Sequence, residues 1–175
     1  RYLAHFRGTS AARVVIRELT TGLEREFPLA AQLGAGGIRW CTADSLIATG
    51  YLDAGVTYRV NINNGSVQRL PIVSNPYPAP LCVAGGEEII YLPSSTAIER
   101  SSLVRRSLAS GRETTLFEGP ITALAGSPDG KQLAVVTVNQ KGDTARVVTM
   151  SAAGDDVSKD LMTSPGFVVA NRFYS

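Results

Sequence analysis

The chain has 175 residues, 44% of them hydrophobic, and a formal net charge of +2, which is enough apolar material to bury a core and too little charge to indicate disorder. Its Lys and Arg residues are scattered, whereas nucleic-acid binding needs a concentrated basic surface, so we expect no nucleic-acid partner. No apolar run approaches the roughly 20 residues of a membrane-spanning helix, so we expect no membrane span in this chain.

The predicted elements, taken in chain order, repeat. Four hairpins, each an alternating strand, a tight turn and a second short strand, start at Ala12, Thr57, Ser101 and Ala145. A glycine recurs in these turns after 43, 46 and 43 residues, at Gly22, Gly65, Gly111 and Gly154. A short apolar strand precedes each hairpin in the same rhythm, starting near Leu3, Leu46, Ile89 and Leu133. Three of these strands follow one further strand, so the repeating unit has four strands in about 43 to 46 residues.

Four-stranded units of this length are typical of β-propeller blades, so the predicted fold class is all-β: a β-propeller made of four-stranded antiparallel blades. A single sheet of this kind exposes two apolar faces, and stacking sheets around an axis covers both. The stretch from Leu133 to Val138 is apolar at almost every position, and we expect neighbouring blades to cover it on both sides. No segment has a sustained helical period with caps.

The repeat divides the single propeller domain, 1–175, into units. We assign residues 1–28 to the second, third and fourth strands of a partial blade, residues 29–71, 72–118 and 119–162 to three blades, and residues 163–175 to the first strand of a next or closing blade. Three completions stay open. The chain is an excerpt of a longer propeller of about six to eight blades, which we favour, or two copies complete a ring, or the last strand closes a ring of four blades. Open strand edges would favour self-association.

One repeat carries a recognisable signature, SPDGKQLA. The residues that match a W-S-P-D-G-K-x-L-A pattern are Ser127, Pro128, Asp129, Gly130, Lys131, Leu133 and Ala134. A degenerate copy, WCTADSLIA, contains Trp40 and Leu46. The chain therefore resembles the repeats of TolB-like β-propellers, which also occur in prolyl-oligopeptidase-like proteins, tricorn-type proteins and some bacterial sensor proteins. The resemblance implies a bacterial, non-catalytic propeller that binds another protein.

The residues with reactive side chains are few. Cys41 and Cys82 are too few for a disulfide scaffold, and we interpret them as buried free thiols, with one disulfide left open. The single histidine, His5, lies in an apolar strand and is interpreted as structural. No G-x-S-x-G elbow indicates a Ser-His-Asp triad, and no ligand spacing indicates zinc. We expect no catalytic residue, no metal and no cofactor in this chain.

Three glycine-containing segments are interpreted as turns or loops. Pro128, Asp129 and Gly130 form a structural turn, because proline presets φ and Asp-Gly supplies positive φ, and no D-x-D-x-D-G pattern surrounds Asp129. Asn64 and Gly65 form a hairpin turn for the same reason. The segment LGAGGIRW precedes a strand and not a helix, so it is interpreted as a connection between blades, not a dinucleotide site.

The loops remain as the candidate binding surface, because binding residues on rigid scaffolds concentrate there. We expect the connections between blades and those between second and third strands to share one face of the disc. The candidate binding residues on this loop face are Asn75, Tyr77, Glu99, Arg100, Lys141 and Asp143. Tyr and Arg are the types that most often anchor interfaces.

Three functions are consistent with these features. We favour a non-catalytic scaffold that binds a protein or peptide through the loop face. The second is the substrate-gating propeller of a prolyl-oligopeptidase-like serine peptidase whose catalytic domain lies outside this chain, and a downstream nucleophile elbow in the same gene would favour it. The third is a sensor ectodomain for a small ligand, which ligand screening by thermal shift would reveal. The compartment stays open between a bacterial periplasmic or extracellular location and the cytoplasm.

Overall fold

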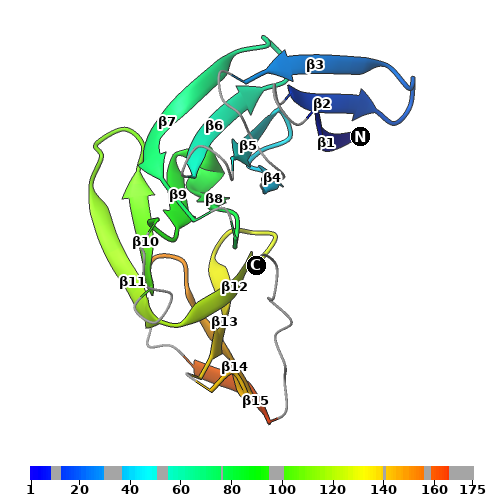
Figure 1. The fold of residues 1–175 in the computed structure, drawn as a ribbon. Coiled ribbons are helices and arrows are strands. Elements are labelled where there is room, and N and C mark those ends of the chain that lie inside the picture. The colour runs from blue at the N-terminus through cyan, green and yellow to red at the C-terminus, as the bar shows by residue number, and fades with distance from the viewer. Residues whose placement is uncertain are drawn as a thin grey trace.

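The computed structural model describes residues 1–8, 13–29, 37–50, 55–75, 77–94, 101–139, 141–155 and 159–165. The regular structure of these residues is almost entirely β-strand, arranged in four antiparallel sheets (Figure 1). Sheet 1 contains β1 (Tyr2–Arg7), β2 (Arg13–Glu18) and β3 (Glu24–Pro28). Sheet 2 contains β4 (Ile38–Trp40), β5 (Ser45–Thr49), β6 (Val56–Asn61) and β7 (Val67–Val73).

The next two sheets have the same strand order. Sheet 3 contains β8 (Leu81–Val83), β9 (Glu88–Tyr91), β10 (Ser101–Ser107) and β11 (Glu113–Gly119), with a short 3-10 helix, η1 (Ala84–Gly86), between β8 and β9. Sheet 4 contains β12 (Ile121–Gly126), β13 (Gln132–Val138), β14 (Thr144–Ser151) and β15 (Lys159–Pro165). Within the described residues, no helix has the length and apolar character needed to cross a membrane.

Every strand pairs antiparallel with the strand that follows it in its own sheet, so each sheet is a meander. The sheets follow one another around an arc, with β4 and β8 toward its inside and β7 and β11 toward its outside (Figure 1). This arrangement confirms the predicted fold class, an all-β structure built from propeller blades.

The tight turns between third and fourth strands lie where the glycine rhythm predicts them. The turn glycines have positive backbone φ angles between 72° and 79°, which residues with a Cβ atom rarely adopt; these glycines are Gly22, Gly65, Gly111 and Gly154. Gly65 closes its turn by donating from its backbone N to the Asn61 carbonyl at 3.0 Å, and Gly111 does the same to Ser107 at 2.9 Å. The repeated glycines therefore mark repeated hairpins, as expected.

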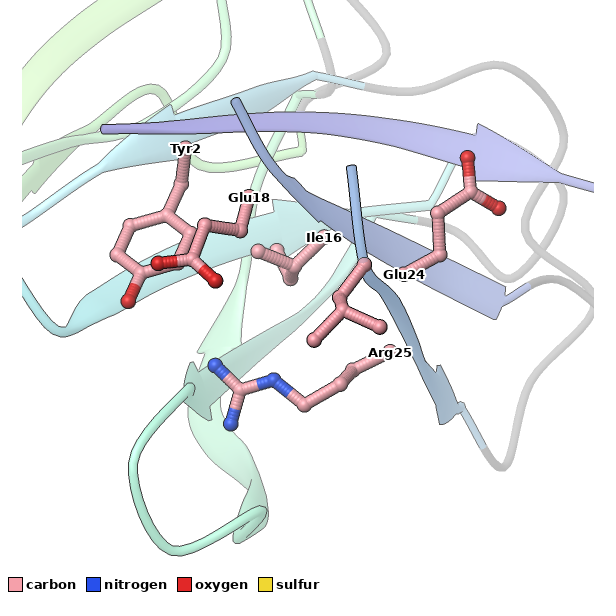
Figure 2. Close-up of a pocket in the computed structure, with 6 residues that line it drawn as sticks. Tyr2, Ile16, Glu18, Glu24 and Arg25 are labelled. Atoms are coloured by element: carbon pink, nitrogen blue, oxygen red, sulfur yellow. The ribbon is translucent and has the colours of Figure 1, made fainter. Parts of the chain in front are cut away.

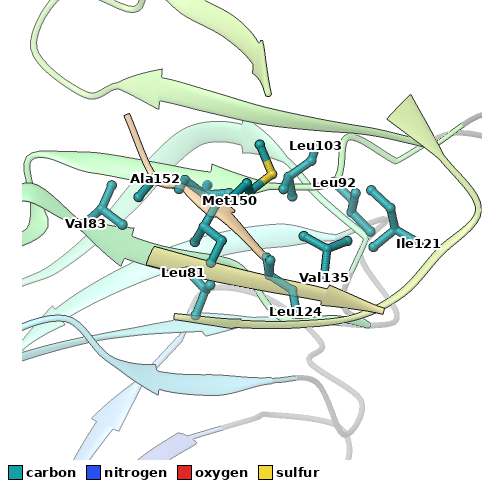
Figure 3. Close-up of a cluster of buried hydrophobic side chains, with 11 residues drawn as sticks. Leu81, Val83, Leu92, Leu103, Ile121, Leu124, Val135, Met150 and Ala152 are labelled. Carbon is teal, nitrogen blue, oxygen red and sulfur yellow. The ribbon is translucent and has the colours of Figure 1, made fainter. Parts of the chain in front are cut away.

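The core lies in three seams, each between two consecutive sheets. The seam between sheets 1 and 2 includes Val14, Ile16, Phe27, Leu46 and Val60. The seam between sheets 2 and 3 includes Ile47, Leu70, Ile72, Ile89, Tyr91 and Val104. The seam between sheets 3 and 4 includes Leu81, Ile90, Leu103, Leu133, Val135 and Met150, and Figure 3 shows its side chains gathered between the two sheets.

Successive residues of an inner strand enter different seams, because side chains alternate along a strand. On β5, Leu46 packs toward sheet 1 and Ile47 toward sheet 3. On β9, Ile89 packs toward sheet 2 and Ile90 toward sheet 4. These two sheets have a neighbour on each side, so both strand faces are buried and the apolar run needs no polar alternation.

The strand β13 departs from the expectation that both of its faces are covered. Leu133 and Val135 are buried in the seam with sheet 3, with exposed fractions of 1% and 0%. Ala134 and Val136, on the opposite face, are only half-buried. The physical reason is that sheet 4 ends the array of described sheets, so only one of its faces has a partner.

Candidate functional site

The connection from β7 to β8 holds two of the predicted binding residues, Asn75 and Tyr77. Asn75 donates its backbone N–H to the Leu92 carbonyl at 2.6 Å, and its Oδ1 accepts the backbone N–H of Tyr77 at 3.0 Å. Ser74 forms an isolated bridge with Pro93, so the connection is tied to the segment that follows β9. Asn75 is therefore occupied in shaping this connection, whereas the Tyr77 side chain is 53% exposed.

The turn between β13 and β14 holds two more predicted residues, Lys141 and Asp143. The Asp143 carboxylate accepts hydrogen bonds from Asn139 Nδ2 at 2.6 Å and from Thr144 Oγ1 at 3.0 Å, and its backbone N–H donates to Asn139 Oδ1. These bonds lower the pKa of Asp143, with the bond from Asn139 the largest cause. Asp143 thus contributes to its own turn, while Lys141 is exposed beside it.

Two of the candidate binding residues, Glu99 and Arg100, lie outside the described residues, as do the glycines of residues 33–36 and the end of the chain, residues 166–175. The four described candidates all lie at one end of the sheets, where second strands lead to third strands and fourth strands lead to the next sheet. We call this end the loop end, and the opposite end, with the glycine hairpins, the hairpin end.

The signature turn lies at the hairpin end. The Asp129 Oδ1 atom accepts the Ser127 hydroxyl at 2.6 Å and the Lys131 backbone N–H at 3.1 Å, and these bonds, the first of them most, lower the pKa of Asp129. Gly130, with φ of 70°, donates its N–H to the Ser127 carbonyl. The carboxylate is thus directed into the turn itself.

The hairpin end also contains a cleft of about 320 Å³ that sequence reasoning missed. Figure 2 shows its lining at the edge of sheet 1, with the residues Tyr2, Ile16, Glu18, Leu23, Glu24 and Arg25. Ile16 is buried at 1% exposure, whereas Leu23 is 67% exposed. The Tyr2 ring lies 6.3 Å from the Trp40 ring of sheet 2, so an aromatic pair joins the two sheets beside this cleft.

Cys41 and Cys82 form a disulfide, so the expectation of buried free thiols is wrong. Cys41 directly follows β4, Cys82 lies in β8, and their Cα atoms are 5.0 Å apart because the inner strands of consecutive sheets converge. Both cysteines are half-buried. Their spacing of 41 residues, close to one repeat, is the signal that could have indicated neighbouring positions on adjacent blades.

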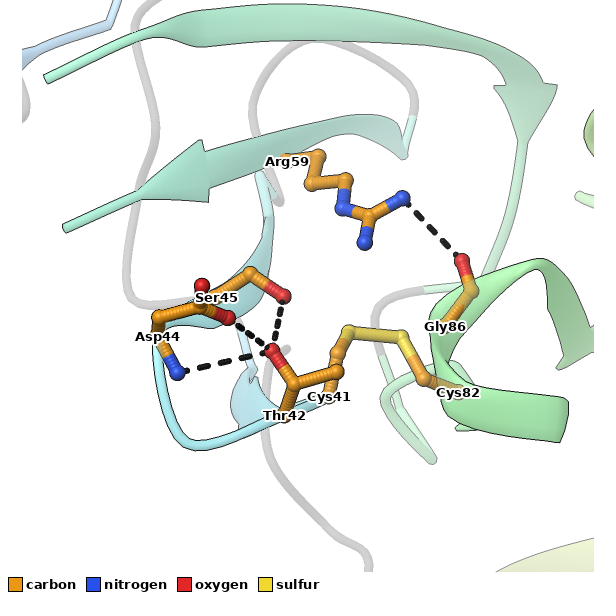
Figure 4. Close-up of a disulfide and its surroundings, with 7 residues drawn as sticks. All are labelled: Cys41, Thr42, Asp44, Ser45, Arg59, Cys82 and Gly86. Carbon is orange, nitrogen blue, oxygen red and sulfur yellow. Dashed lines mark hydrogen bonds between the residues drawn. A yellow bond between two sulfur atoms is a disulfide. The ribbon is translucent and has the colours of Figure 1, made fainter. Parts of the chain in front are cut away.

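Arginine side chains bind backbone carbonyls of other sheets. Figure 4 shows Arg59 of β6 donating from Nη1 to the Gly86 carbonyl at 3.1 Å, close to the disulfide. Arg105 of β10 donates to the carbonyls of Ala152 and Ala153 at 3.2 and 2.7 Å. Arg39 of β4 reaches the Leu124 carbonyl of β12 at 2.9 Å, and burial lowers its pKa. Carbonyl acceptors fix these sheets to one another without requiring buried carboxylates.

The described residues contain no group of three or more His, Cys, Asp or Glu side chains placed to hold a metal ion. His5 lies in β1 opposite Val15 and is half-buried.

The comparison with known proteins rests on structure. No family model and no curated protein matches the sequence. TolB from Acinetobacter baumannii superposes with a TM-score of 0.67 at 17% identity, over 88% of this chain and 39% of that chain. A putative TolB from Agrobacterium tumefaciens superposes with a TM-score of 0.70 at 15% identity, over 94% of this chain and 61% of that chain. The chain has the fold of a TolB-like β-propeller.

The chain with this TolB-like fold also superposes on a prolyl endopeptidase, with a TM-score of 0.67 at 16% identity over 94% of this chain and 28% of that chain. It superposes on a chain of a nidogen/laminin complex as well, with a TM-score of 0.60 at 16% identity over 93% of this chain and 61% of that chain. At these identities the likeness establishes the fold alone. In each case the chain spans less than two thirds of the neighbour.

Proposed function

We propose that the chain is a non-catalytic propeller scaffold that binds a protein or peptide through its loop end. The observation that carries this proposal is the exposed Tyr77 ring on a connection that is fastened to the neighbouring sheet. Tyrosine brings a large contact area with few rotatable bonds, and an interface built on a fixed connection loses less conformational entropy on binding. Lys141 adds a cationic side chain at the same end of the sheets.

The neighbours support a binding role without assigning a partner. One of them is a propeller in a nidogen/laminin complex, so the same fold is found in a protein assembly. Another is a prolyl endopeptidase, which favours the second candidate, a substrate-gating propeller of a larger peptidase. A G-x-S-x-G elbow downstream in the same gene would favour this second candidate over the scaffold.

The test is a selection of binding peptides from a displayed random library, followed by mapping of the selected peptides on the protein by NMR. The expected result is shift changes at the loop end, and a loss of affinity of roughly 30-fold in Tyr77→Ala, which corresponds to about 2 kcal/mol for a hot-spot residue. The matched control is Leu19→Ala, which removes a side chain that is 57% exposed at the opposite, hairpin end. Peptides that map elsewhere, or an unchanged affinity in Tyr77→Ala, would refute the proposal.

The Cys41–Cys82 disulfide supports an oxidising compartment for the folded chain, such as the bacterial periplasm or the extracellular space. Structural disulfides persist there, whereas the glutathione and thioredoxin systems keep cytosolic thiols reduced. Thiol labelling of protein taken directly from the producing cell tests this assignment, and two labelled cysteines would contradict it.

A further inference from the structure

The cleft at the hairpin end has an apolar floor and the charged side chains of Glu18, Glu24 and Arg25 in its lining. Glu24 is already paired with Arg7 at 2.7 Å, so the Glu18 carboxylate and the Arg25 guanidinium are the charges open to a ligand. We propose that it binds a small zwitterion, an apolar α-amino acid, with the ligand's ammonium group at Glu18 and its carboxylate at Arg25 (Figure 2).

Among the described residues, the charges of Glu18 and Arg25 have no ionic partner. Glu18 accepts one hydrogen bond, from the Thr21 hydroxyl at 2.7 Å, and Arg25 donates from Nη1 to the Ile62 carbonyl. Across the part of the chain that the structure describes, neither side chain takes part in an ion pair. A guanidinium has five N–H donors, so the bond to Ile62 holds Arg25 in place and leaves donors for a carboxylate.

The sheet register places the two charges at a separation that suits such a ligand. Ile16 pairs with Arg25 across β2 and β3, and Glu18 lies two residues beyond Ile16 on the same face of β2. Glu18 and Arg25 are therefore diagonal neighbours, about 7–8 Å apart along the sheet, with a Cβ–Cβ distance somewhat shorter than that. A compact ligand that carries both charges fits between the two side chains.

The size and floor of the cleft indicate an apolar ligand side chain. Its volume of about 320 Å³ lies at the lower end of the roughly 300–1,000 Å³ of small-ligand pockets, so a small ligand such as an amino acid fits. Ile16 forms the buried floor, and Leu23 and the Tyr2 ring form apolar walls. Charged groups that set the orientation above an apolar floor are the usual composition of a small-ligand site.

This site is separate from the proposed partner surface. Tyr2, Glu18 and Leu23 lie at the hairpin end, whereas Asn75 and Lys141 lie at the loop end of the sheets. Failure of either proposal therefore leaves the other standing. Occupation of the cleft would give the propeller the small-ligand response expected of a sensor domain.

The experiment measures binding of three probes to the protein by calorimetry and by NMR of the methyl groups. L-Leucine carries both charges, N-acetyl-L-leucine lacks the ammonium, and L-leucinamide lacks the carboxylate. The expected result is that leucine shifts the methyl signals of Ile16 and Leu23, and that each analogue binds at least about tenfold more weakly, because a charge-assisted hydrogen bond is lost. No leucine binding at millimolar concentration, or equal binding of the three probes, would overturn the proposal.

A substitution provides the second measurement. Glu18→Gln is expected to weaken leucine binding by at least about tenfold. Glu118→Gln removes an exposed carboxylate of β11 and is expected to leave binding unchanged. Equal affinities in the two variants would overturn the proposal, and the analogue series decides the question independently if Glu18→Gln does not fold.

Discussion

Gly55 and Ser74 touch through their backbones at the loop end of sheet 2. A Cβ atom at residue 55 would lie 1.6 Å from the Ser74 carbonyl oxygen, and the Gly55 φ of +81° also disfavours any other residue. The Ser74 N–H donates to the Gly55 carbonyl at 3.0 Å, and the buried Ser74 hydroxyl lies 3.2 Å from the Thr57 hydroxyl. This contact fixes the beginning of the connection from β7 to β8, which holds Asn75 and Tyr77.

We expect Gly55→Ala to lower the free energy of unfolding by more than about 3 kcal/mol, because the backbone must move as well as adopt a strained φ. Gly142→Ala is the matched control: its φ is +73°, but no atom lies within 4 Å of the added Cβ, so a loss of about 1 kcal/mol is expected. Guanidinium denaturation measures both. Equal losses would show that the Ser74 contact does not constrain residue 55.

Two adjacent valines test the one-sided burial of β13. Val135 has no exposed surface, and Val136 is half-buried on the other face. Val135→Ala is expected to cost about 2 kcal/mol of stability through lost burial and a cavity, and Val136→Ala about half of that or less. Chemical denaturation of the two variants gives the comparison. A larger cost at Val136 would indicate that another surface covers that face in solution.

Reduction of the disulfide should destabilise the fold. A link across 41 residues restricts the unfolded chain by an amount worth about 4 kcal/mol, with measured values commonly between about 2 and 4. We expect dithiothreitol to lower the denaturation midpoint of the natural chain. The Cys41→Ser/Cys82→Ser double variant should start at the lower midpoint and not respond to reductant; a midpoint equal to that of the oxidised chain would contradict the stabilising role.

Tyr91 should make stability depend on pH in the alkaline range. Burial raises the pKa of Tyr91 to about 12, and its hydrogen bond to Glu113 at 2.8 Å adds to the rise. The folded chain therefore favours the neutral phenol, so this stabilisation is present below pH 10 and is lost between pH 10 and 12. Tyr91→Phe should remove one ultraviolet titration near pH 12 and flatten the loss of stability in that interval. If Tyr91→Phe titrates in the same way as the natural chain, the group with the raised pKa is not Tyr91.

The edge strand β15 carries two large exposed apolar side chains, Leu161 at 69% and Met162 at 58%. Unpaired edges with such residues favour association, so sedimentation should show self-association of the chain. Met162→Lys should shift the distribution toward the monomer, because a charge on the edge opposes pairing. Leu19→Lys, at an exposed hairpin turn, serves as the control and should have no effect. A monomer at all concentrations would contradict this expectation.

The repeat predicted much of the fold, because the features that build a blade are local in the sequence. Gly22, Gly65, Gly111 and Gly154 are needed wherever a tight turn has positive φ, and the alternation around them follows from strand geometry. The same reasoning predicted that Tyr77 lies in a connection between two blades, and the structure places it between β7 and β8. Local chemistry of this kind can be read along the chain without knowledge of distant contacts.

The contacts between sheets could not be predicted in this way. The bond from Arg39 to Leu124 joins residues 85 positions apart, and no local pattern distinguishes this arginine from an exposed one. The cleft likewise depends on how Tyr2, Glu18 and Arg25 come together at the edge of one sheet. The free-thiol interpretation failed for a related reason, since it counted cysteines without considering that one repeat brings them together.

The disulfide also determines what a protease can release. Any single cut of the backbone between Cys41 and Cys82 leaves the two pieces covalently joined, and the buried seam between sheets 2 and 3 holds them in register. A nick in this stretch would therefore pass unnoticed under non-reducing conditions and appear as two fragments only after reduction. A single cut between Cys41 and Cys82 therefore does not release either piece of the chain, even though the backbone itself is cleaved.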